Sequence, residues 1–100
     1  MPEATRQATV PGDHACLAGH FPDRPIVPAV LILELVTDAA REVIGALRVA
    51  AVRSAKFVSP LAPSQTMDIR LDWDAHAIRF RCERDGQPLA QGVLEYVATR

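Results

Sequence analysis

Segment 19–28 of the chain, GHFPDRPIVP, places a histidine just before three prolines spaced three residues apart. Each proline fixes its own φ at about −65° and moves the preceding residue toward extended geometry, so the sequence predicts a stiff loop. An unperturbed imidazole titrates near neutral pH, which suits proton transfer. An isolated histidine is usually a solvated loop residue, but this rigid setting favours a catalytic role for His20.

Glu34 is the second candidate, fourteen residues after His20 and near the start of a helix predicted from Pro28 to Ile44. Its neighbours are leucine, isoleucine and valine, and an apolar setting favours the protonated form of a carboxyl, which can act as an acid. Alternatively, Glu34 is the solvated edge of an amphipathic helix, because it opens a polar stripe. We expect most of the helix to be buried. The other polar residues of the stripe are Thr37, Asp38, Arg41 and Glu42.

These residues together resemble the FabZ-type 3-hydroxyacyl-(acyl-carrier-protein) dehydratases. The resemblance rests on Gly-His-Phe-Pro-x-x-Pro-x-x-Pro, a small residue, Val-Leu and an acid fourteen positions after the histidine. It covers most of the chain through Lys56-Phe57, the segment 59–63, Ile78-Arg79-Phe80 and the segment 91–94. The N-terminal helix and first strand of full-length members have no counterpart here. The chain is therefore most similar to the short FabZ-like, ApeI-like dehydratases of aryl-polyene synthesis.

The resemblance implies elimination of water from (3R)-hydroxyacyl thioesters on acyl carrier protein or coenzyme A, in fatty acid or polyene-type biosynthesis. His20 would take the proton from C2, and Glu34 would protonate or orient the departing 3-hydroxyl. The developing oxyanion would meet first-turn N–H groups at the positive end of the helix dipole. No metal or organic cofactor is implied. The substrate-binding positions implied are Phe21, Pro28, Ala29 and Val30.

Two departures from the family pattern bear on activity. The family usually has glycine where this chain has Ala29, whose methyl group would narrow the thioester channel. Four residues past the acid the family carries glutamine, whereas this chain has Asp38 one turn from Glu34, with Arg41 available to neutralise part of the charge. Two other functions stay open. One is a hotdog acyl thioesterase, because the same fold hosts both activities. The other, suggested by Ala29, is a catalytically degenerate subunit that binds acyl chains or a partner.

Composition limits the function classes further. The 11 basic and 12 acidic residues leave a net charge of −1, so we expect neither nucleic-acid nor membrane binding. No apolar run reaches the length of a membrane span and the N-terminus does not resemble a signal peptide, which predicts a cytoplasmic protein. Cys16 and Cys82 are predicted to be free thiols. His14 and His76, in turn-like contexts, are predicted to be solvated.

The 100 residues are predicted to form a single domain, 1–100, of α+β class. The resemblance names it a hotdog fold, in which a curled antiparallel sheet wraps one long helix. A nearly apolar helix in so short a chain leaves little material to cover the sheet edge, which predicts a homodimer or a higher oligomer. The resemblance further implies that His20 and Glu34 of one site come from different subunits. The predicted strands are Thr5–Val10, Val49–Val58, Met67–Trp73, Ala77–Glu83 and Leu89–Ala98.

Overall fold

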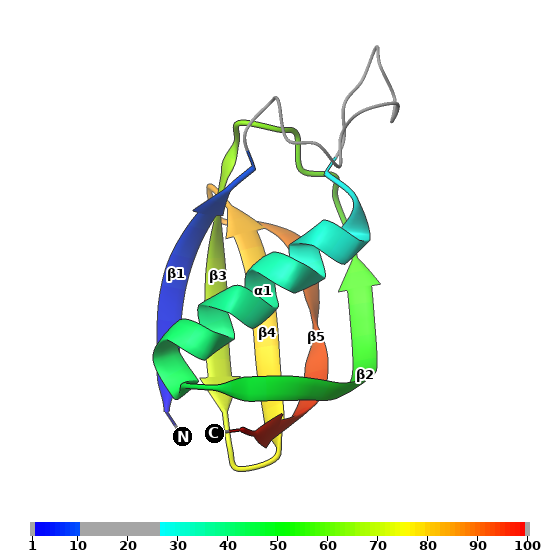
Figure 1. The fold of residues 1–100 in the computed structure, drawn as a ribbon. Coiled ribbons are helices and arrows are strands. Elements are labelled where there is room, and N and C mark those ends of the chain that lie inside the picture. The colour runs from blue at the N-terminus through cyan, green and yellow to red at the C-terminus, as the bar shows by residue number, and fades with distance from the viewer. Residues whose placement is uncertain (1, 11–26, 100) are drawn as a thin grey trace.

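The structure is a computed structural model that describes residues 2–10 and 27–99 of the chain. One helix and five strands make up this part, and they occur at the predicted places, with strand ends shifted by at most two residues (Figure 1). The prediction of a single domain stays a prediction, since residues 11–26 lie outside the described part. The elements are β1 (Glu3–Thr9), α1 (Ala29–Ile44), β2 (Leu47–Phe57), β3 (Thr66–Trp73), β4 (Ala77–Arg84) and β5 (Gln87–Ala98).

The five strands form one antiparallel sheet in the order β1-β3-β4-β5-β2. The sheet curls around α1, which lies across its concave face (Figure 1). Within the described residues β1 and β2 are the two edge strands. Among those residues, no helix combines the length and hydrophobicity needed to cross a membrane.

Both ends of α1 follow from local chemistry. Pro28 is the N-cap of the helix, with φ −61° and ψ 147°, so the helix begins one residue after its predicted start at Pro28. Its carbonyl oxygen accepts hydrogen bonds from the N–H groups of Leu31 and Ile32, at 3.0 and 3.2 Å. Gly45 ends the helix at φ 113°, a conformation that glycine adopts at little cost, and its N–H donates to Arg41 O at 3.1 Å.

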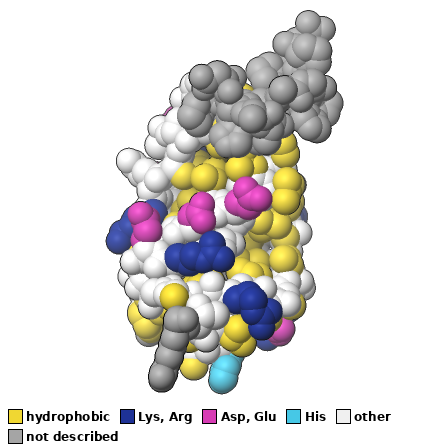
Figure 2. All heavy atoms as spheres, in the orientation of Figure 1, with side chains coloured by type: hydrophobic (Ala, Val, Ile, Leu, Met, Phe, Trp, Pro, Cys, Tyr) yellow, Lys and Arg dark blue, Asp and Glu magenta, His cyan; other side chains and the backbone are white. Residues whose placement is uncertain are grey.

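The core lies between α1 and the concave face of the sheet. Along β3 and β4 the residues alternate between buried and solvent-facing positions, as a sheet covered on one face requires. The prediction that most of α1 is buried is wrong for this chain alone: five of its sixteen residues are buried, because the sheet covers only one side of it (Figure 2). The buried helix residues are Leu31, Ile32, Val36, Ala39 and Ala40.

Gly92 of β5 marks the place where the sheet bends. A Cβ atom there would lie 2.8 Å from Cζ of Phe80 and closer still to the carbonyl oxygen of Ser54 on β2. The pairing of β2 with β5 shifts register between Val52 and Ser54, and β2 turns sharply in Figure 1. Such shifts let a strand bend and strengthen its twist. The missing side chain therefore allows the sheet to close around the helix.

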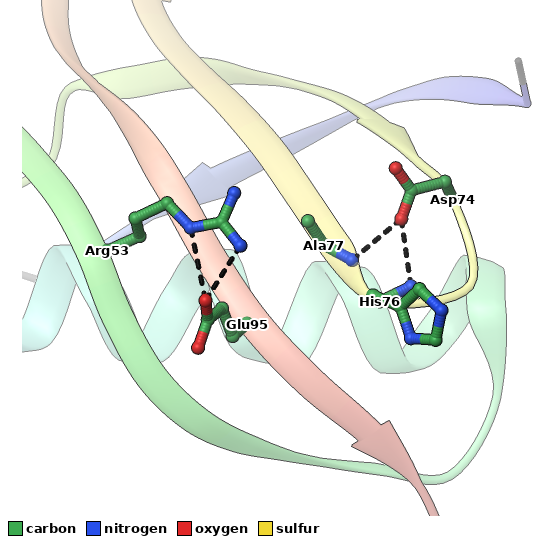
Figure 3. Close-up of polar contacts among 5 residues, drawn as sticks. All are labelled: Arg53, Asp74, His76, Ala77 and Glu95. Carbon is green, nitrogen blue, oxygen red and sulfur yellow. Dashed lines mark hydrogen bonds and ion pairs between the residues drawn. The ribbon is translucent and has the colours of Figure 1, made fainter.

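The chain reverses between β3 and β4, and this turn depends on Asp74 (Figure 3). Its carboxylate Oδ1 accepts hydrogen bonds from the N–H groups of His76 and Ala77, at 2.8 and 2.9 Å. These two bonds, that of His76 first, hold the pKa of Asp74 below its ordinary value. The Tyr96 hydroxyl donates to the Asp74 carbonyl oxygen at 2.5 Å, which ties the turn to β5.

The sequence Asp85-Gly86 is a strong signal for a hairpin, and it joins β4 to β5. Both residues have positive φ, 51° and 80°, and the flanking residues Arg84 and Gln87 are paired. Positive φ at both central positions is the mark of a type I′ turn, whose twist matches that of the strands it joins. The Asp-Gly signal in the sequence is thus confirmed, together with its mechanism.

Candidate functional site

The predicted site residues divide into two groups. His20 and Phe21 lie outside the described residues, and their predicted roles stay predictions. Pro28, Ala29, Val30 and Glu34 lie at the start of α1 or just before it. The described part of the site is therefore the N-terminal end of this helix and its surroundings.

The first turn of α1 is open to solvent. Ala29 and Val30 are exposed, Val30 with 65% of its surface accessible. Their N–H groups make no hydrogen bond to another residue within 2–10 or 27–99. The first carbonyl of the helix, that of Pro28, accepts its hydrogen bonds from Leu31 and Ile32, so the N–H groups before them have no partner within the helix. Free N–H groups at the positive end of a helix dipole attract an oxygen that carries negative charge.

An apolar hollow of about 280 Å³ lies beside this turn. A hydrogen bond of 2.8 Å from Val27 N to Leu61 O joins the residues before the helix to the loop after β2. Another of 2.8 Å, from Val58 N to Leu89 O, holds that loop against β5. The lining residues are Val27, Ala29, Ile32, Phe57, Val58, Ser59, Pro60 and Leu61.

Of the predicted site residues, Ala29 alone lines this hollow among those described. Phe57, Val58, Ser59 and Pro60 were not predicted as site residues, although all of them except Val58 belong to segments that carry the family resemblance. A signal for them exists in the sequence: two large apolar residues stand at a strand end just before a proline. In the structure Phe57 and Val58 remain 41% and 50% accessible, which is high for side chains of this type.

Glu34 is exposed, and the prediction that apolar neighbours surround its carboxyl is wrong for the chain alone. Successive helix residues point about 100° apart, so the adjacent apolar side chains turn toward the sheet while Glu34 turns away from it. Glu34 lies four residues after Val30, on the same face of the helix. Figure 2 shows acidic side chains along this open face, next to apolar surface.

Asp38 follows one turn later on the same face and has the predicted cationic neighbour. Arg41 Nη1 lies 3.4 Å from Asp38 Oδ1, and Arg41 Nε donates to the carbonyl oxygen of Leu47 at 3.3 Å. Arg41 is therefore held between the helix and the start of β2. Its charge offsets part of the repulsion between the carboxylates of Asp38 and Glu34.

Of the other residues with reactive or charged side chains, Cys82 is buried and Arg53 is paired with a carboxylate. Cys82 is a free thiol, as predicted, and its burial raises its pKa to about 12, so it is not a nucleophile. Cys16 and His14 lie outside the described residues. Arg53 of β2 pairs with Glu95 of β5 at 2.7 Å (Figure 3). No cluster of three metal-ligating side chains occurs among the residues that the structure describes.

Comparisons with known proteins identify a family of dehydratases. A protein-family model described as ApeI dehydratase matches residues 2–93. The dehydratase heterocomplex ApeI:P from Xenorhabdus doucetiae has a chain that superposes with a TM-score of 0.85 at 28% identity, covering 95% of this chain and 87% of that one. An (R)-hydratase from A. caviae superposes with a TM-score of 0.77 at 13% identity, covering 98% and 95%. The predicted hotdog fold is confirmed.

A curated relative is the 3-hydroxyacyl-[acyl-carrier-protein] dehydratase FabZ of Chlamydia trachomatis serovar L2. It is 31% identical over 98 residues, which is 83% of this chain and 64% of the relative. The chain thus spans somewhat less than two thirds of the length of this relative.

Proposed function

Because the chain belongs to the ApeI-like dehydratase family, we propose that it eliminates water from 3-hydroxyacyl thioesters, to give trans-2-enoyl thioesters. The observation that carries the proposal is the match of the family model over residues 2–93, which includes both His20 and Glu34. The dehydratase name of the FabZ relative supports an acyl-carrier-protein substrate, with a coenzyme A thioester as the alternative carrier. The proposal retains the cytoplasmic location predicted from the sequence.

In this proposal each residue has a defined role in the elimination. His20 takes the proton from C2, and the electron pair forms the double bond as the C3–O bond breaks. Glu34 gives a proton to the departing hydroxyl, which leaves as water. The N–H groups of Ala29 and Val30 stabilise the charge that develops on the thioester oxygen. Their freedom from hydrogen bonds within the described residues supports this role.

The hollow beside the first turn supports an acyl substrate. Its lining is mostly apolar, and Ala29 contributes to it, so a substrate oxygen near the helix N-terminus would have its carbon chain next to Phe57 and Ile32. Burial of each methylene group contributes about 0.8 kcal/mol, which makes an alkyl or polyene chain a suitable occupant. The methyl group of Ala29 takes up part of the space that the family's usual glycine leaves open.

A second subunit completes the proposed site. Glu34 is exposed in the single chain, and an acid catalyst works best where water is excluded. The outer edge of β2 is unpaired within the described residues, and Val52 and Phe57 on this strand are 50% and 41% exposed. Pairing of two β2 edges would extend the sheet and place both helices on its concave side. The partner would be a second copy, or a different chain as in the Xenorhabdus dehydratase heterocomplex ApeI:P.

The test is an assay that records enoyl formation and free thiol release in parallel, with a 3-hydroxyacyl thioester of acyl carrier protein as substrate. We expect enoyl formation by the wild type, and a loss of about 10²- to 10⁴-fold in His20→Ala and in Glu34→Gln. Glu42→Gln, which removes another exposed carboxylate of α1, is the matched control and should keep its activity.

Each alternative function predicts a different outcome of this assay. Thiol release without enoyl product would identify a thioesterase. Substrate binding without either product would identify a degenerate acyl-binding subunit. Activity near that of the wild type in Glu34→Gln would mean that this carboxyl is only the solvated edge of the helix.

A further inference from the structure

A groove of about 760 Å³ crosses the outer face of the sheet, the face turned away from α1. Volumes of this size are typical of small-molecule sites. The groove is separate from the proposed active site, which lies on the concave side beside the helix N-terminus. All five strands contribute to its lining, which consists of Glu3, Ala4, Thr5, Ser54, Ala55, Lys56, Arg70, Leu71, Asp72, Arg79, Phe80, Arg81, Gln91, Gly92 and Val93.

One wall of the groove is a row of outward-facing residues that are direct neighbours across the strands. We call it the basic row. Its members are Thr5, Arg70, Arg81, Gln91 and Lys56, in spatial order from β1 to β2. The facing wall is the next outward row, formed by Glu3, Asp72, Arg79, Val93 and Ser54.

Two cations of the groove are neutralised by carboxylates of the protein. Arg70 Nε lies 2.6 Å from Glu83 Oε1, and Arg79 Nε lies 2.6 Å from Asp72 Oδ1. Arg81 and Lys56 have no ion pair with a residue in the described part of the chain. The lining holds four cations and two carboxylates, a net charge of +2, in a chain whose net charge is −1.

Arg81 and Lys56 flank Gln91, so three hydrogen-bond donors follow one another along the basic row. No hydrogen bond of the Gln91 side chain to another described residue is present. Arg70 and Arg81 stand directly opposite each other, a pairing of like charges that destabilises a sheet. An anion bound over the row would offset this repulsion and would use all three donors.

The position of the charges favours a small phosphorylated ligand. Arg81 and Lys56 lie two strands apart, which is roughly 9–10 Å at the usual strand spacing, and both side chains can reach toward the ligand. Rows with carboxylates, including Glu3, Asp72 and Glu83, border the basic row on both sides, so an extended acidic protein surface would meet like charge there. We propose that the outer-face groove binds a small molecule carrying a diphosphate group, held by Arg81, Gln91 and Lys56.

The probe for this proposal is inorganic pyrophosphate, titrated by calorimetry into the full chain at constant ionic strength. We expect saturable binding that weakens at least about tenfold in Arg81→Gln and in Lys56→Gln. Arg48→Gln is the matched control, because Arg48 is an exposed cation of β2 outside the groove, and it should bind as the wild type does. Orthophosphate should bind more weakly than pyrophosphate, since it carries one phosphate group.

Two further measurements separate loss of the site from loss of the fold. Arg81→Gln removes the repulsion with Arg70, so it should be at least as stable to urea as the wild type while it binds less pyrophosphate. Lys56 is the only lysine of the chain, so ¹³C reductive methylation gives one lysine resonance, which should shift and saturate together with the calorimetric curve.

Three results would overturn the proposal. One is the absence of saturable pyrophosphate binding. Another is an equal weakening in Arg48→Gln, which would reduce the effect to general charge attraction. The third is a smaller sedimenting species in Arg81→Gln than in the wild type, which would make this face a contact between subunits.

Discussion

Gly92 lies at a point of the sheet where a Cβ atom would have no space. Glycine in a strand interior usually weakens the strand, because it raises the conformational entropy of the unfolded chain and packs no side chain. Here the position lies against the ring of Phe80 and the backbone of Ser54, and only a hydrogen fits between them. The curl of the sheet around α1 therefore depends on the absence of a side chain at residue 92.

We predict that Gly92→Ala destabilises the fold by about 1–3 kcal/mol or more, as overpacking of a filled interior does. Urea unfolding measures this change. A second substitution, Phe80→Leu, should not restore stability, because the backbone oxygen of Ser54 still occupies the space. The control is Gly86→Asn, at φ 80° with no atom within 4 Å, which should cost less than about 1 kcal/mol. Equal costs at both positions would contradict the steric explanation.

Cys82 offers a second test at the scale of one residue. Burial raises its pKa to about 12, so almost no thiolate is present at pH 8. In a Cys16→Ser background we predict that a thiol reagent such as iodoacetamide does not modify the native protein within the time that it modifies the urea-unfolded chain. A Cys16→Ser/Cys82→Ser variant gives the background. Modification of the native protein at the rate of a free thiol would mean that β4 opens readily.

Glu34 is a residue whose surroundings could not be predicted from the sequence. The sequence identified Glu34 as a candidate and offered two alternatives, an acid in apolar surroundings and the solvated edge of a helix. Choosing between them needs the direction of the side chain and the identity of what covers it. In the chain alone Glu34 is exposed, so any apolar cover must come from elsewhere.

Among the elements, the turn between β3 and β4 links protonation to stability. The pKa of Asp74 is lowered in the folded chain, so the charged form contributes stability at pH values above the ordinary carboxyl value of 3.8. This contribution disappears as the pH falls through the lower, folded-state pKa. The hydrogen bonds of the carboxylate to His76 N and Ala77 N are its source.

We predict that Asp74→Ala lowers the free energy of unfolding at neutral pH, and that its difference from the wild type narrows as the pH falls below about 4. Asp74→Asn keeps an acceptor oxygen and should lose less stability, without the pH-dependent part. Urea unfolding at a series of pH values measures both variants. Asp85→Asn also removes a carboxylate from a turn, and it controls for the change in net charge. A constant difference between Asp74→Ala and the wild type at every pH would refute the linkage.

The elements themselves could largely be predicted from sequence, for physical reasons. Alternating burial along β3 and β4, the Asp85-Gly86 turn and the proline and glycine at the two ends of α1 are local signals, and the structure contains each of them. The bend of β2 and the hollow formed by Phe57 and Val58 depend on contacts between strands far apart in the chain. No short window of the sequence contains such contacts.

At the scale of the whole molecule, two uncovered surfaces of the described chain bear on assembly. One is the outer edge of β2, and the other is the face of α1 that carries Val30 and Glu34. Exposed sheet edges in native proteins are usually paired, charged or covered, and the β2 edge, with exposed Val52 and Phe57, is neither paired nor covered within the described residues. A two-fold dimer through β2 would pair this edge, and sedimentation should therefore give a dimer at micromolar concentration.

The sharing of each active site between subunits has a test that depends on symmetry alone. Inactive His20→Ala and Glu34→Gln dimers are mixed under conditions that let subunits exchange. If each site takes His20 from one subunit and Glu34 from the other, half of the dimers become mixed and each holds one complete site. The mixture should then regain about a quarter of the wild-type activity.

Two controls make the result of this mixing decisive. Exchange is proven separately with tagged wild-type subunits. Mixing His20→Ala dimers with the wild type should leave the total activity equal to that of the wild-type protein added, because each wild-type His20 still completes one site. If both residues act within one subunit, no mixed dimer contains a complete site, and the mixture stays inactive despite proven exchange. In that case each subunit would hold a complete catalytic pair, and a partner could contribute to the site only by covering the exposed Glu34.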